Sequence, residues 1–217
     1  MEGKIIMINL SNYIKSCEKN NIQILENTDS LHFDNKPVVK IHQDINYQNT
    51  NNYPDKKFFQ RNCEESENVF CLPLGIQDNT DSLIEKTLEK NLEKTILCSS
   101  QYSQFTRKEL LPEYSFVTYF EKEPIEKYLE NIAKSKYVIS PHGMRPDCYR
   151  HWESLYLNAI PITLKHPKLK SFEDLPILFL NSWDELSEEL LINEYESLLN
   201  KSREKLDLNY WIKLMKE

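Results

Sequence analysis

Residues 140–159 constrain the fold more than any other part of the sequence. An apolar run at 136–140 precedes them and predicts a short buried strand, and a second apolar run follows at 160–164. Between the runs lie a polar loop that contains Gly143 and a segment with helical spacing. A strand, a loop, a helix and a second strand form the unit with which α/β proteins hold phosphorylated ligands.

The rest of the sequence continues this alternation. Strands are expected at 5–10, 22–25, 37–42, 68–75, 94–99, 116–120 and 175–180. Helices are expected at 11–19, 81–94, 106–111, 124–133, 184–205 and 206–215. The stretch 43–57 lacks an apolar period and predicts a long loop. The alternation predicts an α/β fold with one mainly parallel sheet or two such sheets.

The charged helix expected at 81–94 is the best place for a domain boundary. It divides the 217 residues into a lobe of residues 1–92 and a lobe of residues 93–217. Glycine is rare, with three residues where average usage would give roughly 15. We therefore expect Gly75 and Gly143 at positions that tolerate no side chain.

Charge and cysteine usage limit the functions that fit this chain. A formal net charge of −7 argues against nucleic-acid or membrane-surface binding. Residues 136–170 nevertheless contain six Lys or Arg against two acidic residues, a local charge of +4 that fits a small anionic ligand. The five cysteines are dispersed without a metal-binding pattern, which predicts reduced thiols and no metal site. The N-terminal apolar run is too short for a signal peptide or membrane span, so we expect a soluble, cytoplasmic protein.

The segment after the loop predicts a helix whose N-terminus favours an anion. Asp147 is the expected N-cap of a helix that continues to residue 158. His142, Arg145 and Arg150 add donors suited to a diphosphate, and Glu153 could accept both hydroxyls of a ribose. Ordinary structural roles remain open: Arg150 and Glu153 as a surface salt bridge, and Asp147 as a cap alone.

Other side chains near this helix have simpler interpretations. Tyr149, Trp152 and Tyr156 share a face with residue 159, which we expect to pack in the core. His151 is expected to face outward. Lys165 and His166 follow the second strand and either lie near the same site or on the solvated surface.

The motifs SPHG at 140–143, DCYR at 147–150, WE at 152–153, IPI at 160–162 and EDLPI at 173–177 occur in a distinctive order, with Trp183 after them. In this combination the chain resembles the C-terminal half of exostosin-like glycosyltransferases over roughly residues 134–190. A weaker similarity lies at 59–62 and 72–76. Arg145 stands where relatives usually have a second glycine, so the loop is either stiffer or uses the arginine as a phosphate ligand.

The resemblance implies a GT-B architecture of two Rossmann-like lobes, compact and with a shortened N-terminal lobe. It implies metal-independent, inverting transfer of a sugar from a UDP- or GDP-linked donor to a glycan or glycoconjugate acceptor. The expected donor site consists of Ser140, His142, Gly143, Arg145, Arg150 and Glu153.

The acceptor hydroxyl requires a general base, for which Asp44 or His42 in the N-terminal lobe is the candidate. Arg61 could also contact phosphate. A non-catalytic nucleotide-sugar or glycan-binding module is the main alternative function. Another α/β enzyme for a phosphorylated small molecule, such as a phosphatase, is disfavoured because no Cys-x5-Arg, DxD or metal cluster occurs.

Overall fold

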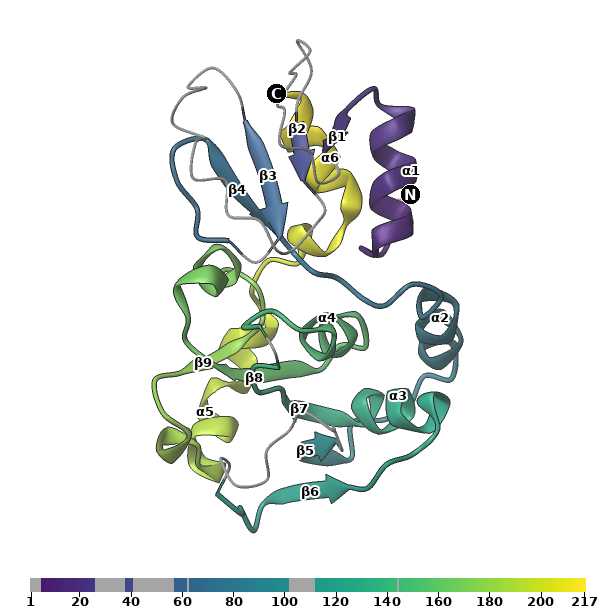
Figure 1. The fold of residues 1–217 in the computed structure, drawn as a ribbon. Coiled ribbons are helices and arrows are strands. Elements are labelled where there is room, and N and C mark those ends of the chain that lie inside the picture. Colours follow the sequence, from purple (N-terminus) through teal and green to yellow (C-terminus); the bar gives the residue numbers. More distant parts are fainter. Residues whose placement is uncertain (1–4, 26–37, 41–56, 62, 102–111, 144) are drawn as a thin grey trace.

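The computed structural model describes residues 5–25, 38–40, 57–61, 63–101, 112–143 and 145–217, and these residues form an α/β protein with two sheets (Figure 1). Every pairing between the strands of both sheets is parallel. The predicted α/β class with parallel sheets is therefore confirmed.

The first sheet is built from residues 23–72. Its strands lie in the order β1 (Gln23–Leu25), β2 (Val38–Lys40), β3 (Phe58–Arg61) and β4 (Val69–Leu72). The sequence pattern does not predict β3, because Gln60 and Arg61 are buried with its two phenylalanines and interrupt the apolar run. The helix α1 (Leu10–Lys19) precedes this sheet, and the C-terminal α6 (Leu208–Lys216) packs against α1 (Figure 1).

The strand expected at residues 5–10 is wrong, because residues 5–9 belong to neither sheet and α1 begins at Leu10. Asn9 is the N-cap of α1, and its side-chain oxygen accepts a 2.8 Å hydrogen bond from the backbone N–H of Asn12. Ile8 is buried, and its carbonyl accepts a 2.8 Å hydrogen bond from the N–H of Ile76. The segment before α1 thus lies against the chain that leaves β4.

The second sheet is built from residues 96–180. Its strands lie in the order β6 (Val117–Phe120), β5 (Ile96–Gln101), β7 (Ser135–Ile139), β8 (Ile160–Leu164) and β9 (Leu178–Leu180). Counted along the chain this order is 2-1-3-4-5, a doubly wound arrangement whose direction reverses between β5 and β7. The helices of this part are α2 (Asp81–Glu89), α3 (Ile125–Ala133), α4 (Tyr149–Tyr156) and α5 (Glu188–Leu199).

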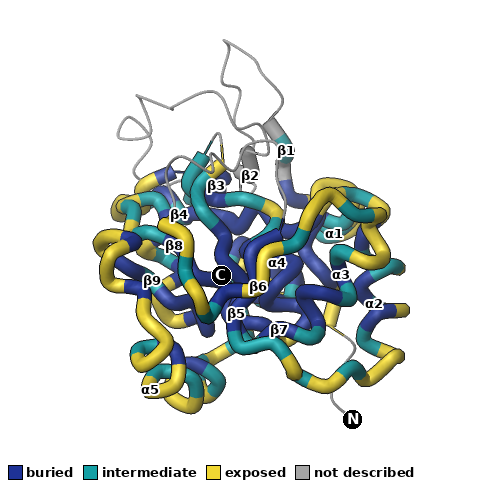
Figure 2. The backbone as a smooth tube through the Cα atoms, turned by 90° about the horizontal axis from the view of Figure 1, so that it is seen from below, coloured by how far each residue is buried: buried dark blue, intermediate teal, exposed yellow. Residues whose placement is uncertain are grey.

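Two hydrophobic cores cover the two faces of the second sheet. Along β7, Val138 belongs to the core beneath α3 and α4, whereas Tyr137 and Ile139 belong to the core beneath α5. The first of these cores continues into the first sheet, where it includes Phe59 and Leu72. Figure 2 shows this buried interior in dark blue, with α4 and β7 within it. The two sheets are therefore joined by shared apolar packing.

The expected helix at 184–205 is wrong in its extent. A short 3₁₀ turn, Trp183–Glu185, comes first, and Leu186 then has an extended backbone. α5 begins after Ser187, whose side chain accepts a 3.2 Å hydrogen bond from the N–H of Leu190. α2 likewise ends before residue 94, because Asn91 takes a left-handed backbone conformation just beyond it.

Gly75 occupies a position where a side chain cannot fit, as the sequence predicts. Its φ of +74° lies in the left-handed region. A Cβ atom there would lie 2.1 Å from the carbonyl oxygen of Ile8. This glycine therefore allows the close approach of the segment before α1 to the chain after β4.

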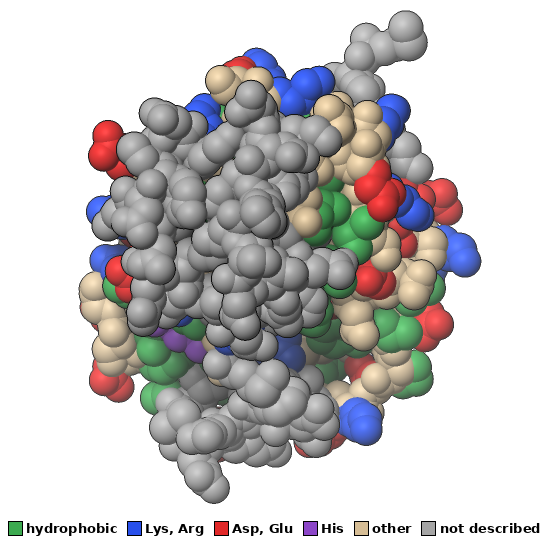
Figure 3. Space-filling view, turned by 45° about the horizontal axis from the view of Figure 1, so that its top comes forward, with side chains coloured by type: hydrophobic (Ala, Val, Ile, Leu, Met, Phe, Trp, Pro, Cys, Tyr) green, Lys and Arg blue, Asp and Glu red, His purple; other side chains and the backbone are tan. Residues whose placement is uncertain are grey.

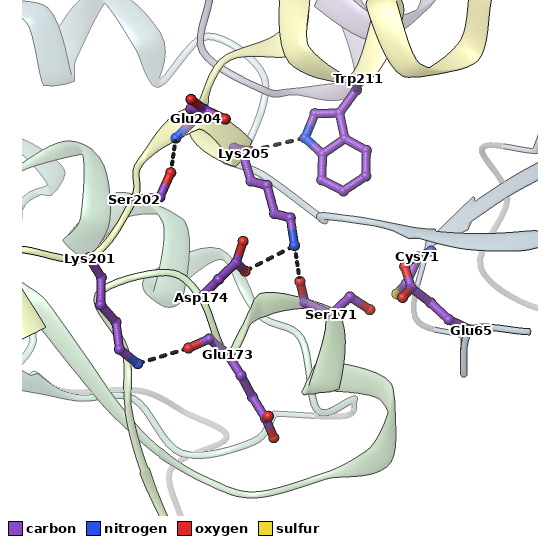
Figure 4. Close-up of polar contacts among 10 residues, drawn as sticks. All are labelled: Glu65, Cys71, Ser171, Glu173, Asp174, Lys201, Ser202, Glu204, Lys205 and Trp211. Atoms are coloured by element: carbon purple, nitrogen blue, oxygen red, sulfur yellow. Dashed lines mark hydrogen bonds and ion pairs between the residues drawn. The ribbon is translucent and has the colours of Figure 1, made fainter. Parts of the chain in front are cut away.

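The C-terminal part of the chain is fastened to the EDLPI segment by a set of polar contacts (Figure 4). Nζ of Lys205 donates hydrogen bonds of 2.5 Å to the carbonyl oxygen of Ser171 and 2.9 Å to Oδ1 of Asp174. Nζ of Lys201 donates 2.8 Å to the carbonyl oxygen of Glu173. In this structure the carboxylate of Asp174 and the backbone carbonyls of Ser171 and Glu173 therefore hold the C-terminal segment.

Candidate functional site

The loop between β7 and α4 lies at the reversal point of the second sheet. β7 ends at Ile139 beside β5, which ends at Gln101. The N–H of Ser140 still donates a 2.9 Å hydrogen bond to the carbonyl oxygen of Ile162 in β8. The loop thus leaves the sheet at the carboxyl ends of three strands, where open α/β sheets bind their ligands.

Asp147 does not cap α4, so that prediction is wrong. Cys148 is the N-cap residue, and its side chain makes no capping hydrogen bond. The carboxylate of Asp147 accepts two 2.7 Å hydrogen bonds, from the N–H of Leu74 to Oδ2 and from Nε1 of Trp152 to Oδ1. Within the described residues, the N-terminus of α4 therefore has no side-chain cap, a condition that favours an anion.

The environment of Asp147 is that of a structural group. The residue is 5% exposed, and burial raises the pKa of its carboxyl. The hydrogen bonds from Leu74 and Trp152 and the charges of His151 and Arg61 act against that rise. Because each of its oxygens accepts a buried donor, Asp147 joins the chain after β4 to α4.

A polar cluster lies beneath the loop. Nδ1 of His151 is 2.7 Å from Sγ of Cys148 and 3.2 Å from Oγ of Ser140. His151 is 1% exposed, so the expectation that it faces outward is wrong. The loop places Ser140 and Cys148 around the first turn of α4. The spacing of apolar residues in the sequence does not predict this tertiary contact.

The cysteine and the histidine of this cluster form a neutral pair. Burial lowers the pKa of His151 to about 4 and raises the pKa of the Cys148 thiol to about 11. A nucleophilic cysteine needs a thiolate, which a neighbouring imidazolium normally stabilises. With both groups neutral near pH 7, the cysteine is not a thiolate, and the contacts of its Sγ with Nδ1 of His151 and Oγ of Ser140 support the loop.

Arg150 and Glu153 are close together, but Tyr128 of α3 joins them inside the protein. The hydroxyl of Tyr128 donates a 2.5 Å hydrogen bond to Oε2 of Glu153, which is 6% exposed. Burial raises the pKa of Glu153, while the Tyr128 hydrogen bond and the charge of Arg150 oppose that rise. A surface salt bridge does not fit this pair, because Glu153 is buried.

Two histidines face each other on the other side of the loop. Nε2 of His142 donates a 3.1 Å hydrogen bond to the carbonyl oxygen of Leu164, at the end of β8. The ring centroids of His142 and His166 are 5.6 Å apart and nearly perpendicular. Burial lowers the pKa of His142, so its imidazole is neutral near pH 7. Figure 3 shows histidine side chains (purple) on this face of the molecule.

The tip of the loop is narrow and accessible. The N–H of Gly143 donates a 3.1 Å hydrogen bond to the carbonyl oxygen of Arg145, whose side chain is half-buried. Gly143 is exposed, and a Cβ atom there would meet no described atom within 4 Å. The prediction that Gly143 excludes a side chain is therefore wrong.

The structure describes only one of the three candidate residues of the first lobe. His42 and Asp44, the predicted bases, lie outside the described residues. Arg61 ends β3, is 5% exposed and lies over the ring of Tyr13 at 5.2 Å. Its charge lowers the pKa of Asp147, which indicates that it lies near the start of α4. Nε and Nη2 of Arg61 are buried and have no hydrogen-bond partner in the described part of the chain.

Tyr128 is the residue of this site that sequence reasoning misses. The sequence predicts an apolar helix face from the spacing of Ile125, Tyr128, Leu129 and Ile132. On such a face a tyrosine is interpreted as a core residue. A buried tyrosine hydroxyl nevertheless needs a hydrogen-bond partner. That requirement is the one signal in the sequence that Tyr128 has a polar partner, and it does not show that the partner is Glu153.

Among the described residues, no group of three or more His, Cys, Asp or Glu side chains is placed to hold a metal ion. Nor does the described part contain a helix long and apolar enough to cross a membrane. No protein-family model matches this sequence, and no curated protein matches it either. The exostosin-like resemblance therefore remains a prediction.

Proposed function

We propose that this chain is a glycosyltransferase that uses a nucleotide-diphosphate sugar as its donor. The observation that carries the proposal is the position of the loop at 140–148, at the reversal point of a doubly wound sheet and before a helix N-terminus without a side-chain cap. The local excess of basic residues supports an anionic ligand. The exostosin-like motifs narrow that ligand to a nucleotide sugar.

In this proposal the diphosphate binds at the N-terminus of α4. Arg145 and Arg150 supply positive charge, and the neutral imidazole of His142, whose Nε2–H donates to Leu164, contributes Nδ1 as an acceptor. Glu153 accepts hydrogen bonds from the ribose. Ser140 contributes by supporting the loop, since its N–H donates to Ile162 and its side chain contacts Cys148 and His151.

The chemistry in this proposal is an inverting transfer without a metal. A base, Asp44 or His42, takes the proton of the acceptor hydroxyl, whose oxygen attacks the anomeric carbon as the glycosyl–phosphate bond breaks. The helix N-terminus and the arginines stabilise the charge on the departing nucleoside diphosphate. The proposal includes a GT-B arrangement, with the donor on the second sheet and a glycan or glycoconjugate acceptor on the first.

A cytoplasmic location belongs to the same proposal. All five cysteines are unpaired, and four of them are buried: Cys17, Cys63, Cys71 and Cys98. Free buried thiols are typical of a reducing compartment.

A non-catalytic nucleotide-sugar or glycan-binding module is the second candidate. It is favoured by the internal contacts of the site, because Asp147, Ser140 and one oxygen of Glu153 already have protein partners. Such a module would bind the donor without transferring or hydrolysing it.

A thermal-shift titration tests the proposal. UDP, GDP and their sugars are added to the wild type, to Arg145→Gln and to Lys213→Gln, a matched charge loss on the exposed surface of α6. A ligand at 100 times its Kd should stabilise the wild type by about 2.7 kcal/mol. Arg145→Gln should reduce this gain and Lys213→Gln should retain it. Failure of every nucleotide to stabilise the wild type would reject the proposal. Binding without hydrolysis of any donor or transfer to any acceptor would favour the module.

A further inference from the structure

Tyr128 and Glu153 connect α3 to α4 inside the protein. The 2.5 Å hydrogen bond from the phenol to Oε2 joins residues 25 positions apart in the chain. The two helices pack against each other on the same face of the second sheet. The carboxylate is thus held by a hydrogen bond from a second element, in addition to the charge of Arg150 on its own helix.

Packing around α3 restrains the Tyr128 hydroxyl. Its neighbours on α3, Leu129 and Ile132, are fully buried and fix the helix against the core. A tyrosine side chain has only two rotatable bonds, whereas a glutamate has three. The rigid partner therefore restrains the flexible one, and it occupies only Oε2 of the carboxylate.

This arrangement suits recognition of two neighbouring hydroxyl groups. A carboxylate has four lone-pair sites, so Glu153 retains acceptor capacity beyond the bond from Tyr128. Burial raises the pKa of Glu153, and the hydrogen bond from Tyr128 and the charge of Arg150 oppose that rise, so both neighbours support the ionised form, which is the better acceptor. An acceptor that is already fixed loses less conformational entropy when a ligand binds.

We propose that Tyr128 is a positioning residue that makes Glu153 selective for ribose, so that the chain binds ribonucleoside diphosphates more tightly than their 2′-deoxy forms. The inference rests on the proposed function, because that function assigns the ribose to Glu153. It adds a residue outside the loop and α4, and a specificity that can be measured.

The test is calorimetric titration of UDP, 2′-deoxy-UDP, GDP and 2′-deoxy-GDP into the full chain. Of the uracil and guanine nucleotides, the pair that binds should show a wild-type affinity about 10-fold higher for the ribonucleotide than for its deoxy form. This ratio corresponds to one hydrogen bond to a charged group. Tyr128→Phe should reduce this preference to about 2-fold, with a smaller loss of affinity for the deoxynucleotide, which keeps only its 3′-hydroxyl for Glu153. Tyr195→Phe is the matched control, because it removes a phenol from α5 on the opposite face of the sheet, and it should keep the wild-type preference.

Two further variants separate positioning from folding. Glu153→Asp keeps the charge but withdraws the carboxylate from Tyr128, so it should lose the preference even if Tyr128→Phe folds poorly. In a double-mutant cycle, adding Tyr128→Phe to Glu153→Gln should change the preference no further, because the two residues act as one unit.

The outcomes distinguish this inference from the function on which it rests. If no nucleotide binds the wild type, both are wrong. If ribonucleotides bind and Tyr128→Phe keeps the preference, the positioning role alone is wrong. An equal loss of affinity for both forms of the nucleotide would also overturn it, because a merely structural role produces that result.

Discussion

The regions around Asp147 and Glu153 place two carboxylates, six residues apart, in opposite situations. Asp147 lies where the first sheet meets α4, and its two oxygens accept hydrogen bonds from Leu74 and Trp152. Glu153 lies between α3 and α4, and the bond from Tyr128 occupies one of its oxygens. Burial raises the pKa of both carboxyls.

The two carboxylates differ in how much hydrogen-bond acceptor capacity remains for a ligand. A buried acceptor with a donor on each oxygen stabilises the fold, and its removal leaves buried donors unsatisfied. A carboxylate held by one oxygen is oriented and can still accept from a ligand. The region around Asp147 is therefore a junction between the two sheets, and the region around Glu153 is the better candidate for ligand recognition.

The largest effect is expected at Gly75, within the junction. Gly75→Ala places a Cβ atom 2.1 Å from the carbonyl oxygen of Ile8 and strains a left-handed backbone. The free energy of unfolding should fall by about 3–5 kcal/mol, as measured by urea denaturation. Gly143→Ala is the control and should change it by less than about 0.5 kcal/mol, because no described atom lies near its Cβ. Similar values for the two variants would show that the junction is not closely packed.

Asp147→Asn should have the next largest effect on the free energy of unfolding. The amide offers one oxygen where two donors need acceptors, and its NH₂ group then faces a donor. We expect the free energy of unfolding to fall by about 2–4 kcal/mol. Asp184→Asn, on the exposed surface, should be nearly neutral.

The ligand response of Asp147→Asn sharpens the comparison. Nucleotide binding should raise the stability of this variant by the same increment as in the wild type, whereas Glu153→Gln should lose its preference for ribose. Loss of that preference in Asp147→Asn would contradict the division between junction and recognition region.

The third prediction concerns pH and His151, which faces Ser140 and Cys148 and lies near Asp147. Its pKa in the folded protein is about 4, below the ordinary value of 6.5, so the unfolded chain binds the proton more tightly. The contribution of His151 to stability is complete above pH 6.5 and declines as the pH falls toward 4, by up to about 3 kcal/mol. His151→Gln should remove this slope from the stability–pH curve. The raised pKa values of Asp147 and Glu153 act in the opposite direction in both proteins, so the difference between the two curves reports His151 together with its effect on Asp147. Parallel curves would show that His151 is not buried in its neutral form.

The second sheet was largely predictable because its strands are short apolar runs between polar turns. The runs at 94–99, 116–120 and 136–140 correspond to β5, β6 and β7 within about two residues. The loop at 140–148 could be located because it follows such a run and precedes a helical period. Its place at the reversal point depends on strand order, which local patterns do not encode.

The errors at Asp147 and His151 come from long-range contacts. Asp147 has the local signature of an N-cap, but Leu74, 73 residues away, offers it a buried N–H. His151 lies on a polar turn of α4, but the loop closes over it. β3 is missed because two of its buried residues are polar. In each case a tertiary partner decides the role, and the partner cannot be identified from periodicity.

The smallest effect is expected for Tyr156→Phe, which removes one hydroxyl from the junction. That hydroxyl accepts a 2.8 Å hydrogen bond from the N–H of Ile8 and donates a 2.6 Å hydrogen bond to the carbonyl oxygen of Leu206. Its loss leaves both backbone groups without this partner while the ring still fills its place in the core. The free energy of unfolding should fall by about 1–2 kcal/mol, and the preference for ribose should not change. Amide hydrogen exchange at Ile8 should accelerate in this variant. Unchanged exchange there would mean that the Tyr156 hydroxyl does not limit the opening of the segment before α1.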